Sequence, residues 1–191
     1  LAKHFTVVAS DLRGYGESSK PAGKADHSSY SKRSMAADQV ALMKALGHDQ
    51  FFLLGHDRGG RVSHRLAMDH PKSVKKLMVL DISPTLCMYE NTTMEFARGY
   101  WHWFFLIQPE PVPETMISAN PEFWLKNHMG RHAGTGIFSP DRWAEYLAGA
   151  SNPVGIHAMC EDYRAAATID LVHDRADREA GKSLTMPIHV L

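Results

Sequence analysis

The sequence has no net charge, no long apolar run and almost no cysteine. Among its 191 residues, 21 lysines and arginines balance 21 aspartates and glutamates, so the chain lacks the basic surface that binds nucleic acids and anionic membranes. Its apolar runs are only a few residues long, far short of the roughly 20 residues that cross a bilayer. Cys87 and Cys160 are too few for a disulfide framework, and the N-terminus has no signal-peptide pattern. We therefore expect a cytoplasmic protein that binds neither nucleic acid nor membranes.

Short apolar runs alternate with helical patterns over the first ninety residues. β-Branched and aromatic runs predict strands at residues 5–9, 51–55 and 76–81, with a further strand beginning within residues 186–191. Apolar residues at helical spacing predict helices over residues 34–46 and 60–70. This alternation is typical of an α/β fold with a mostly parallel sheet covered by helices on both faces.

The second half of the chain has a different pattern. Between Cys87 and about Ala180 aromatic residues cluster and prolines interrupt helical stretches, without a strand pattern. We interpret this region as a helical insertion over the sheet. The predicted parts are a partial α/β core (1–85), a helical cap (86–180) and a truncated return to the core (181–191).

One short segment carries most of the chemical information. Residues 55–59, Gly-His-Asp-Arg-Gly, lie between a predicted strand and a predicted helix, the context of a nucleophile elbow. We expect Gly55 and Gly59 to allow the strand and helix to approach closely. Asp57 takes the nucleophile position, where a carboxylate needs no base to displace a leaving group from a saturated carbon. The alternative is that Asp57 is a helix N-cap, which explains neither glycine.

Two arginines follow Asp57 in the first turn of the predicted helix. Arg58 and Arg61 are three residues apart, so their side chains can lie on one face. Two cations at a positive helix N-terminus are unfavourable unless an anion is present, and a guanidinium suits a carboxylate well. We therefore expect them to bind a substrate carboxylate while Asp57 attacks the adjacent carbon. The alternative is ion pairing with acidic residues of neighbouring helices.

Several motifs in one order resemble a known family. They lie within residues 11–18, 55–67, 80–85, 100–105, 108–114 and 159–164, and together they resemble the fluoroacetate (haloacetate) dehalogenases of the α/β-hydrolase fold. This resemblance implies a mostly parallel sheet flanked by helices with an inserted helical cap. It also implies hydrolytic dehalogenation of short 2-haloacids by water through an Asp ester, without a metal or organic cofactor, and it makes a homodimer plausible.

The resemblance also implies roles for individual residues. Asp57 is expected to be the nucleophile, Asp81 the acid that orients a catalytic histidine, and Arg58 and Arg61 the carboxylate-binding pair. The expected halide-binding residues are His102, Trp103 and Tyr163. Their N–H and O–H groups are neutral donors that can stabilise a departing halide, although aromatic residues in an insertion also commonly serve packing alone.

Two features of the family pattern do not occur in these residues. They are a histidine near the C-terminal end and a His-Gly loop before the first strand. We therefore expect a chain truncated at both ends that does not turn over substrate alone. A metal site at His128 and His132 is not expected, because Gly130 weakens a helix between them. The alternative functions are an epoxide hydrolase, which also uses an Asp nucleophile, and a non-catalytic module that binds a small carboxylate.

Overall fold

The computed structural model describes residues 1–129 and 135–191. Its strands are β1 (Phe51–His56), β2 (Val74–Leu80) and β3 (Ile188–Val190). Its α-helices are α1 (Lys32–Ala45), α2 (Asp57–Asp69), α3 (Thr85–Glu90), α4 (Met94–Gly99), α5 (Trp101–Leu106), α6 (Val112–Ala119), α7 (Pro121–Met129), α8 (Pro140–Ala150), α9 (Pro153–Ala167) and α10 (Ile169–Glu179). Three short 3-10 helices are η1 (Ser28–Tyr30), η2 (Pro71–Ser73) and η3 (Thr135–Ile137).

The described strands form one parallel sheet in the order β1-β2-β3. His56 at the end of β1 is paired with Leu80 at the end of β2, and Val79 is paired with Val190 of β3. All three strands therefore end at the same edge of the sheet, and whatever follows β1 and β2 lies there side by side.

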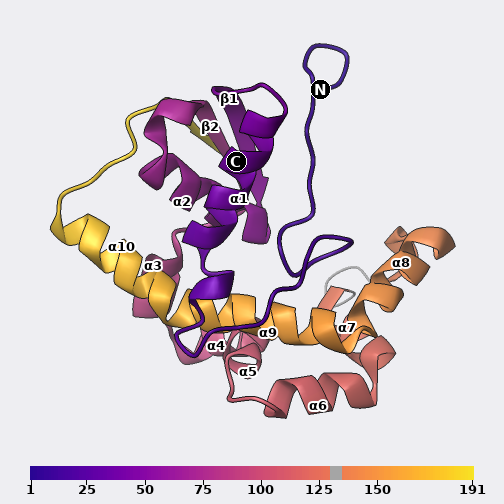
Figure 1. The fold of residues 1–191 in the computed structure, drawn as a ribbon. Helices are drawn as coiled ribbons and strands as arrows, with labels where there is room; N and C mark the ends of the chain where they lie inside the picture. The colour runs from indigo at the N-terminus through magenta and orange to yellow at the C-terminus, as the bar shows by residue number, and fades with distance from the viewer. Residues whose placement is uncertain (130–134) are drawn as a thin grey trace.

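Helices α1 and α2 pack beside the sheet, with α2 starting directly after β1 (Figure 1). Val62 and Leu66 of α2 are four residues apart, so they lie on one face of the helix. Both are buried against Leu77 and Val79 of β2 and Met35 of α1. This apolar cluster is the core of the sheet region, and it fixes the start of α2 above the ends of the strands.

Helices α9 and α10 run one after the other beside the sheet region, and α4, α5 and α6 lie on the other side of this pair (Figure 1). Ala158 and Ala165 of α9 belong to the core of the sheet region, whereas Ile156 and Cys160 belong to a second apolar cluster. The second cluster consists mainly of large side chains, namely Trp103, Leu106, Ile117, Trp124, Ile156, Cys160 and Tyr163. Helix α9 is thus shared by both clusters.

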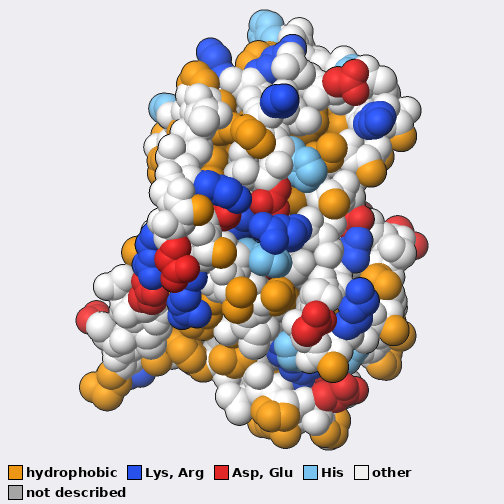
Figure 2. Space-filling model, turned by 60° about the vertical axis from the view of Figure 1, so that its left-hand side comes forward, with side chains coloured by type: hydrophobic (Ala, Val, Ile, Leu, Met, Phe, Trp, Pro, Cys, Tyr) orange, Lys and Arg blue, Asp and Glu red, His pale blue; other side chains and the backbone are white. Residues whose placement is uncertain are grey.

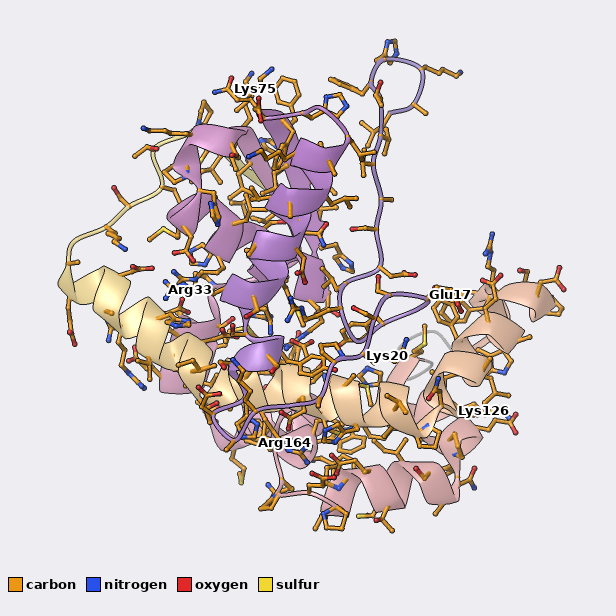
Figure 3. The ribbon with its side chains drawn as sticks, in the orientation of Figure 1. Glu17, Lys20, Arg33, Lys75, Lys126 and Arg164 are labelled. Atoms are coloured by element: carbon orange, nitrogen blue, oxygen red, sulfur yellow. The ribbon has the colours of Figure 1, made fainter. Side chains whose placement is uncertain are left out.

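Ion pairs reinforce the packing on both sides of α9. Arg164 of α9, labelled in Figure 3, pairs with Glu114 of α6 at 2.7 Å. Arg33 of α1 pairs with Asp69 of α2 at 2.8 Å. No helix among the described residues combines the length and apolarity that a bilayer-crossing segment needs.

Most of the expected elements are confirmed, with one correction. The strands at 51–55, 76–81 and 186–191 and the helices at 34–46 and 60–70 correspond to β1, β2, β3, α1 and α2. The strand expected at residues 5–9 is wrong, because these residues form no regular structure and pair with no described strand. Phe5 and Val7 are each 51% exposed. A β-branched run becomes a strand only when a neighbour satisfies its backbone and covers a face.

Candidate active site

Asp57 and Asp81 lie next to each other at the edge where the strands end. Asp57 directly follows His56 of β1, and Asp81 directly follows Leu80 of β2. His56 and Leu80 are paired with each other in the sheet. Both have a φ of 47°, a left-handed conformation that few non-glycine residues adopt. Both side chains are exposed. The N-cap position of α2 is held by His56, so the alternative in which Asp57 is the N-cap is wrong.

Glycines allow β1 and α2 to meet at a sharp turn. Of the two expected glycines, Gly55 and Gly59, only Gly55 has this role. A Cβ atom at Gly55 would lie 2.5 Å from the backbone oxygen of Gly59 and 2.5 Å from the Ser63 hydroxyl. Gly55 is therefore required by contact. A Cβ at Gly59 would have no neighbour within 4 Å, so the expectation for Gly59 is wrong. The second close approach is at Gly60, where a Cβ would lie 3.0 Å from Ile82.

Arg58 is buried and paired on one side only. Its Nε donates to Oδ2 of Asp162 at 2.7 Å, and its Nη2 donates to the Asp162 backbone oxygen at 3.0 Å. The guanidinium lies over the Tyr163 ring, 4.1 Å from the centroid. Its Nη1 is buried and has no hydrogen-bond partner in the described structure. Burial disfavours the charged guanidinium, but the attraction of Asp162 outweighs it and holds the pKa of Arg58 well above its usual value.

Arg61 has a different environment, in which no described carboxylate forms an ion pair with it. Its Nη1 donates at 3.0 Å to both the Ser83 backbone oxygen and the Thr85 hydroxyl, and its guanidinium lies 4.4 Å from the centroid of the Trp103 ring. Its Nε is buried without a hydrogen-bond partner among the described atoms. Burial and the nearby positive charge of Arg58 lower the pKa of Arg61 to about 10. Ion pairing, the alternative expected for both arginines, therefore occurs at Arg58 and not at Arg61.

The three aromatic residues expected to bind halide lie together. His102 and Trp103 come from α5 and Tyr163 from α9, and all three are buried. The Tyr163 ring centroid lies 6.0 Å from that of His102 and 6.2 Å from that of Trp103. Trp103 and Tyr163 also belong to the second apolar cluster. Each of these two side chains therefore both packs in the apolar cluster and contacts an arginine.

Asp57, at the start of α2, affects the pKa values of Tyr163 and Arg61. Burial raises the pKa of Tyr163, and Asp57 raises it further against the opposing effect of Arg58. Asp57 also favours the charged form of Arg61. The start of α2, the aromatic residues of α5 and the middle of α9 therefore form one site. Figure 2 shows charged side chains across the middle of one face, between the sheet region and the helices below it.

Sequence reasoning missed the buried polar groups behind Arg58. Asp162 has no exposed surface, and it accepts hydrogen bonds from Tyr15 at 2.6 Å, from Arg58 and from Lys32. Burial alone would raise the pKa of Asp162, but Arg58 and Lys32 together hold it well below its usual range. These groups come from segments up to 147 residues apart. The one available signal was the run of charged residues beside Tyr163 in the middle of a helix.

Nothing among the described residues groups three or more histidines, cysteines, aspartates or glutamates in a way that could hold a metal ion. His128 stacks on Trp124, with ring centroids 5.3 Å apart. His132, considered with it as a metal ligand, lies outside the described residues.

Residues 1–180 match the family described as alpha/beta hydrolase fold. The chain is 50% identical over 179 residues to a fluoroacetate dehalogenase from Burkholderia sp, covering 93% of this chain and 59% of that protein. It is 31% identical to a soluble epoxide hydrolase from Corynebacterium sp. (strain C12), covering 98% and 64% of the two chains. A crystal structure of a candidate α/β hydrolase from Nostoc sp PCC 7120 is 55% identical, with a TM-score of 0.90 over 94% of this chain and 62% of that one. The chain thus spans about six tenths of the length of these relatives.

Proposed function

The chain belongs to the α/β-hydrolase fold family, and from that premise we propose that the protein hydrolyses short 2-haloacids such as chloroacetate and fluoroacetate. One observation carries the proposal. Asp57 lies at the start of a helix whose beginning also holds two buried arginines, each with one guanidinium nitrogen that has no described hydrogen-bond partner. The 50% identity to a fluoroacetate dehalogenase supports the same chemistry.

In the proposed first step, Asp57 acts as the nucleophile of an elbow between β1 and α2. A carboxylate oxygen of Asp57 forms a bond to the carbon that carries the halogen, and the carbon–halogen bond breaks with its electron pair leaving on the halide. The product is an ester of Asp57. Nη1 of Arg58 and Nε of Arg61 are the groups available to bind the substrate carboxylate, and a bound anion would compensate the unpaired charge of Arg61.

In the same step, His102, Trp103 and Tyr163 would stabilise the departing halide. A donor placed where charge develops in a buried site contributes roughly 3 kcal/mol by comparison with oxyanion-hole donors. Burial raises the pKa of Tyr163, so its phenol stays protonated and keeps its O–H group for donation. This stabilisation matters most for fluoride, which is a poor leaving group.

The second proposed step is hydrolysis of the ester by water. A histidine base would activate the water, and Asp81, the neighbour of Asp57 at the sheet edge, would orient that base. We assign no histidine of this chain to that role. Turnover is accordingly proposed for the full-length protein.

The direct test is halide release from chloroacetate and fluoroacetate by the full-length protein and by Asp57→Asn. We expect Asp57→Asn to lower the rate by about a thousandfold or more, because the amide is a far weaker nucleophile. Asp141→Asn, at an exposed position of α8, serves as the matched control and should keep full activity. Undiminished halide release by Asp57→Asn would overturn the assignment.

Epoxide hydrolysis is the second candidate, supported by the relative from Corynebacterium. It would use the same Asp57 nucleophile but would need a donor to protonate the ring oxygen, and a neutral epoxide gives the unpaired Arg61 no counter-charge. Styrene oxide in parallel assays separates the two functions. Opening of styrene oxide without halide release from either haloacid would favour the epoxide hydrolase.

A further inference from the structure

Arg58 is held in place by a buried carboxylate that takes no part in the chemistry described above. Asp162 receives donors from three separate segments: Tyr15 of an N-terminal loop, Lys32 at the start of α1, and Arg58. Each oxygen of the Asp162 carboxylate has at least one partner, since Lys32 contacts Oδ1 while Tyr15 and Arg58 contact Oδ2. Because both of its carboxylate oxygens are hydrogen-bonded, Asp162 is fixed in one arrangement relative to these three segments.

The contact divides the guanidinium of Arg58 into two sides. Nε and Nη2 are occupied by Asp162, through its carboxylate and its backbone oxygen. The Tyr163 ring covers one face of the guanidinium, and Nη1 is left buried without a partner in the described residues. Because Asp162 and Tyr163 are consecutive on α9, the same helical turn fixes both the edge and the face of Arg58.

The charges of the cluster explain why a carboxylate is needed at this position. Lys32, Arg58 and Arg61 are three buried cations, and Arg58 already disfavours the charged form of Arg61. Asp170 lies 3.4 Å from Nζ of Lys32, but burial raises the pKa of Asp170 and so disfavours its negative charge. Asp162 forms ion pairs with both Lys32 and Arg58. Without it, Arg58 would be a buried cation beside two others, and its side chain would move toward solvent or another acceptor.

We propose that Asp162 is a positioning residue for substrate binding, which acts by holding Nη1 of Arg58 toward the substrate carboxylate. This role rests on the proposed function, because it assumes that Arg58 binds the carboxylate of the substrate. Asp162 itself touches neither the substrate nor Asp57 in this role.

Asp162→Asn in the full-length protein tests the proposal, because it keeps the shape of the side chain and removes its charge. We expect the KM for chloroacetate and the inhibition constant of acetate to rise about tenfold to a hundredfold, the range for weakening a charge-assisted contact. We expect kcat to change by less than about threefold, since uniform binding is what is lost.

The matched control is Asp177→Asn, which removes a buried carboxylate paired with another arginine of α2. Asp177 bonds to Arg65 at 2.5 Å and is 5% exposed, but nothing described connects it to Arg58. Both variants should lose thermal stability, whereas the acetate constant should rise only in Asp162→Asn. Equal acetate constants in the two variants would reduce Asp162 to a structural residue and overturn the proposal.

A double-mutant cycle with Arg58→Gln tests whether Asp162 acts through Arg58. In the Arg58→Gln background, Asp162→Asn should cause no further rise in the acetate constant, because the positioned group is already absent. Additive rises would contradict the proposed route.

NMR of the Arg58 side chain in the protein without substitutions tests the proposal independently. It can be carried out even if Asp162→Asn does not fold or if the protein releases no halide. The Nε–H proton of Arg58, assigned by its loss in Arg58→Lys, should be visible and slow to exchange, and acetate should leave it bonded while shifting the Nη signals. Fast exchange of Nε–H, or its displacement by acetate, would overturn the positioning role. Absence of halide release together with the expected Nε–H behaviour would instead reject the haloacid function alone.

Discussion

Arg58 and Arg61 lie within one turn of each other at the start of α2, yet their electrostatic environments are opposite. Arg58 has a buried counter-ion in Asp162, whereas Arg61 donates hydrogen bonds only to uncharged acceptors among the described residues, including the backbone oxygen of Ser83 and the hydroxyl of Thr85. The pKa of Arg58 is accordingly raised and that of Arg61 lowered to about 10. A lowered pKa means that the fold disfavours the charge that Arg61 carries at neutral pH. The residue that we propose to bind the substrate carboxylate is therefore also expected to lower the stability of the ligand-free protein.

Substitution of Arg61 should therefore separate stability from binding. We expect Arg61→Gln to raise the free energy of unfolding by about 1 kcal/mol without ligand, because it removes an uncompensated buried charge, and to weaken acetate binding about tenfold or more. Chemical denaturation and acetate inhibition of the full-length protein measure the two effects.

Arg65→Gln is the matched control one helical turn further on. Arg65 is buried and forms ion pairs with Asp69, Asp174 and Asp177. Its loss leaves Asp174 without a described ion-pair partner, whereas Asp69 and Asp177 keep Arg33 and Lys182. This loss should cost about 3–5 kcal/mol. Destabilisation of similar size in both variants would show that Arg61 is an ordinary structural cation.

At the scale of elements, the turn from β1 into α2 depends on one glycine more than on its neighbours. Periodicity in the sequence was sufficient to predict β1, α2 and β2, because apolar alternation and helical spacing are local properties. It could not reveal which glycine is in contact, because the atoms that would meet a Cβ at Gly55 belong to the next turn of α2. It also failed at residues 5–9, where strand formation depends on a partner and not on the run itself. Asp162, 104 residues from Arg58, was inaccessible for the same reason.

Gly55→Ala and Gly59→Ala should have opposite effects on stability. A methyl group at Gly55 would meet backbone and hydroxyl oxygens at 2.5 Å, so we expect a loss of about 3 kcal/mol or failure to fold. Gly59 has open space within α2, and alanine there should stabilise the helix by up to about 1 kcal/mol. Thermal unfolding of both variants decides the point, and a neutral Gly55→Ala would contradict the close approach.

At the scale of the whole molecule, the described sheet has two unpaired edges. Phe52 and Leu54 of β1 are 56% and 49% exposed, and Ile188 and Val190 of β3 are also exposed. Open strands with apolar side chains readily pair with other chains. The apolar groove between residues 6–10 and β1 adds to this surface.

A polypeptide of residues 1–191 alone should consequently self-associate. We expect sedimentation velocity at micromolar concentration to give large species, and Leu54→Lys to reduce them, since a charge on an edge strand opposes pairing. Lysine at Val172, an exposed apolar position on α10, is the control and should have little effect. A monodisperse monomer for residues 1–191 would contradict this expectation.

The adjacency of Asp162 and Tyr163 on α9 has a consequence for how substrate range can change. Asp162 positions Arg58, which we propose to bind the substrate carboxylate, and Tyr163 is a proposed hydrogen-bond donor to the halide. Any shift of α9 that widened the space for a larger halogen would also displace Asp162, and with it the Arg58 side chain proposed to bind the substrate carboxylate. Evolution or engineering toward bulkier leaving groups is therefore expected to proceed through His102 of α5, because its neighbour Trp103 lies against the guanidinium of Arg61 and so affects the carboxylate-binding pair as well.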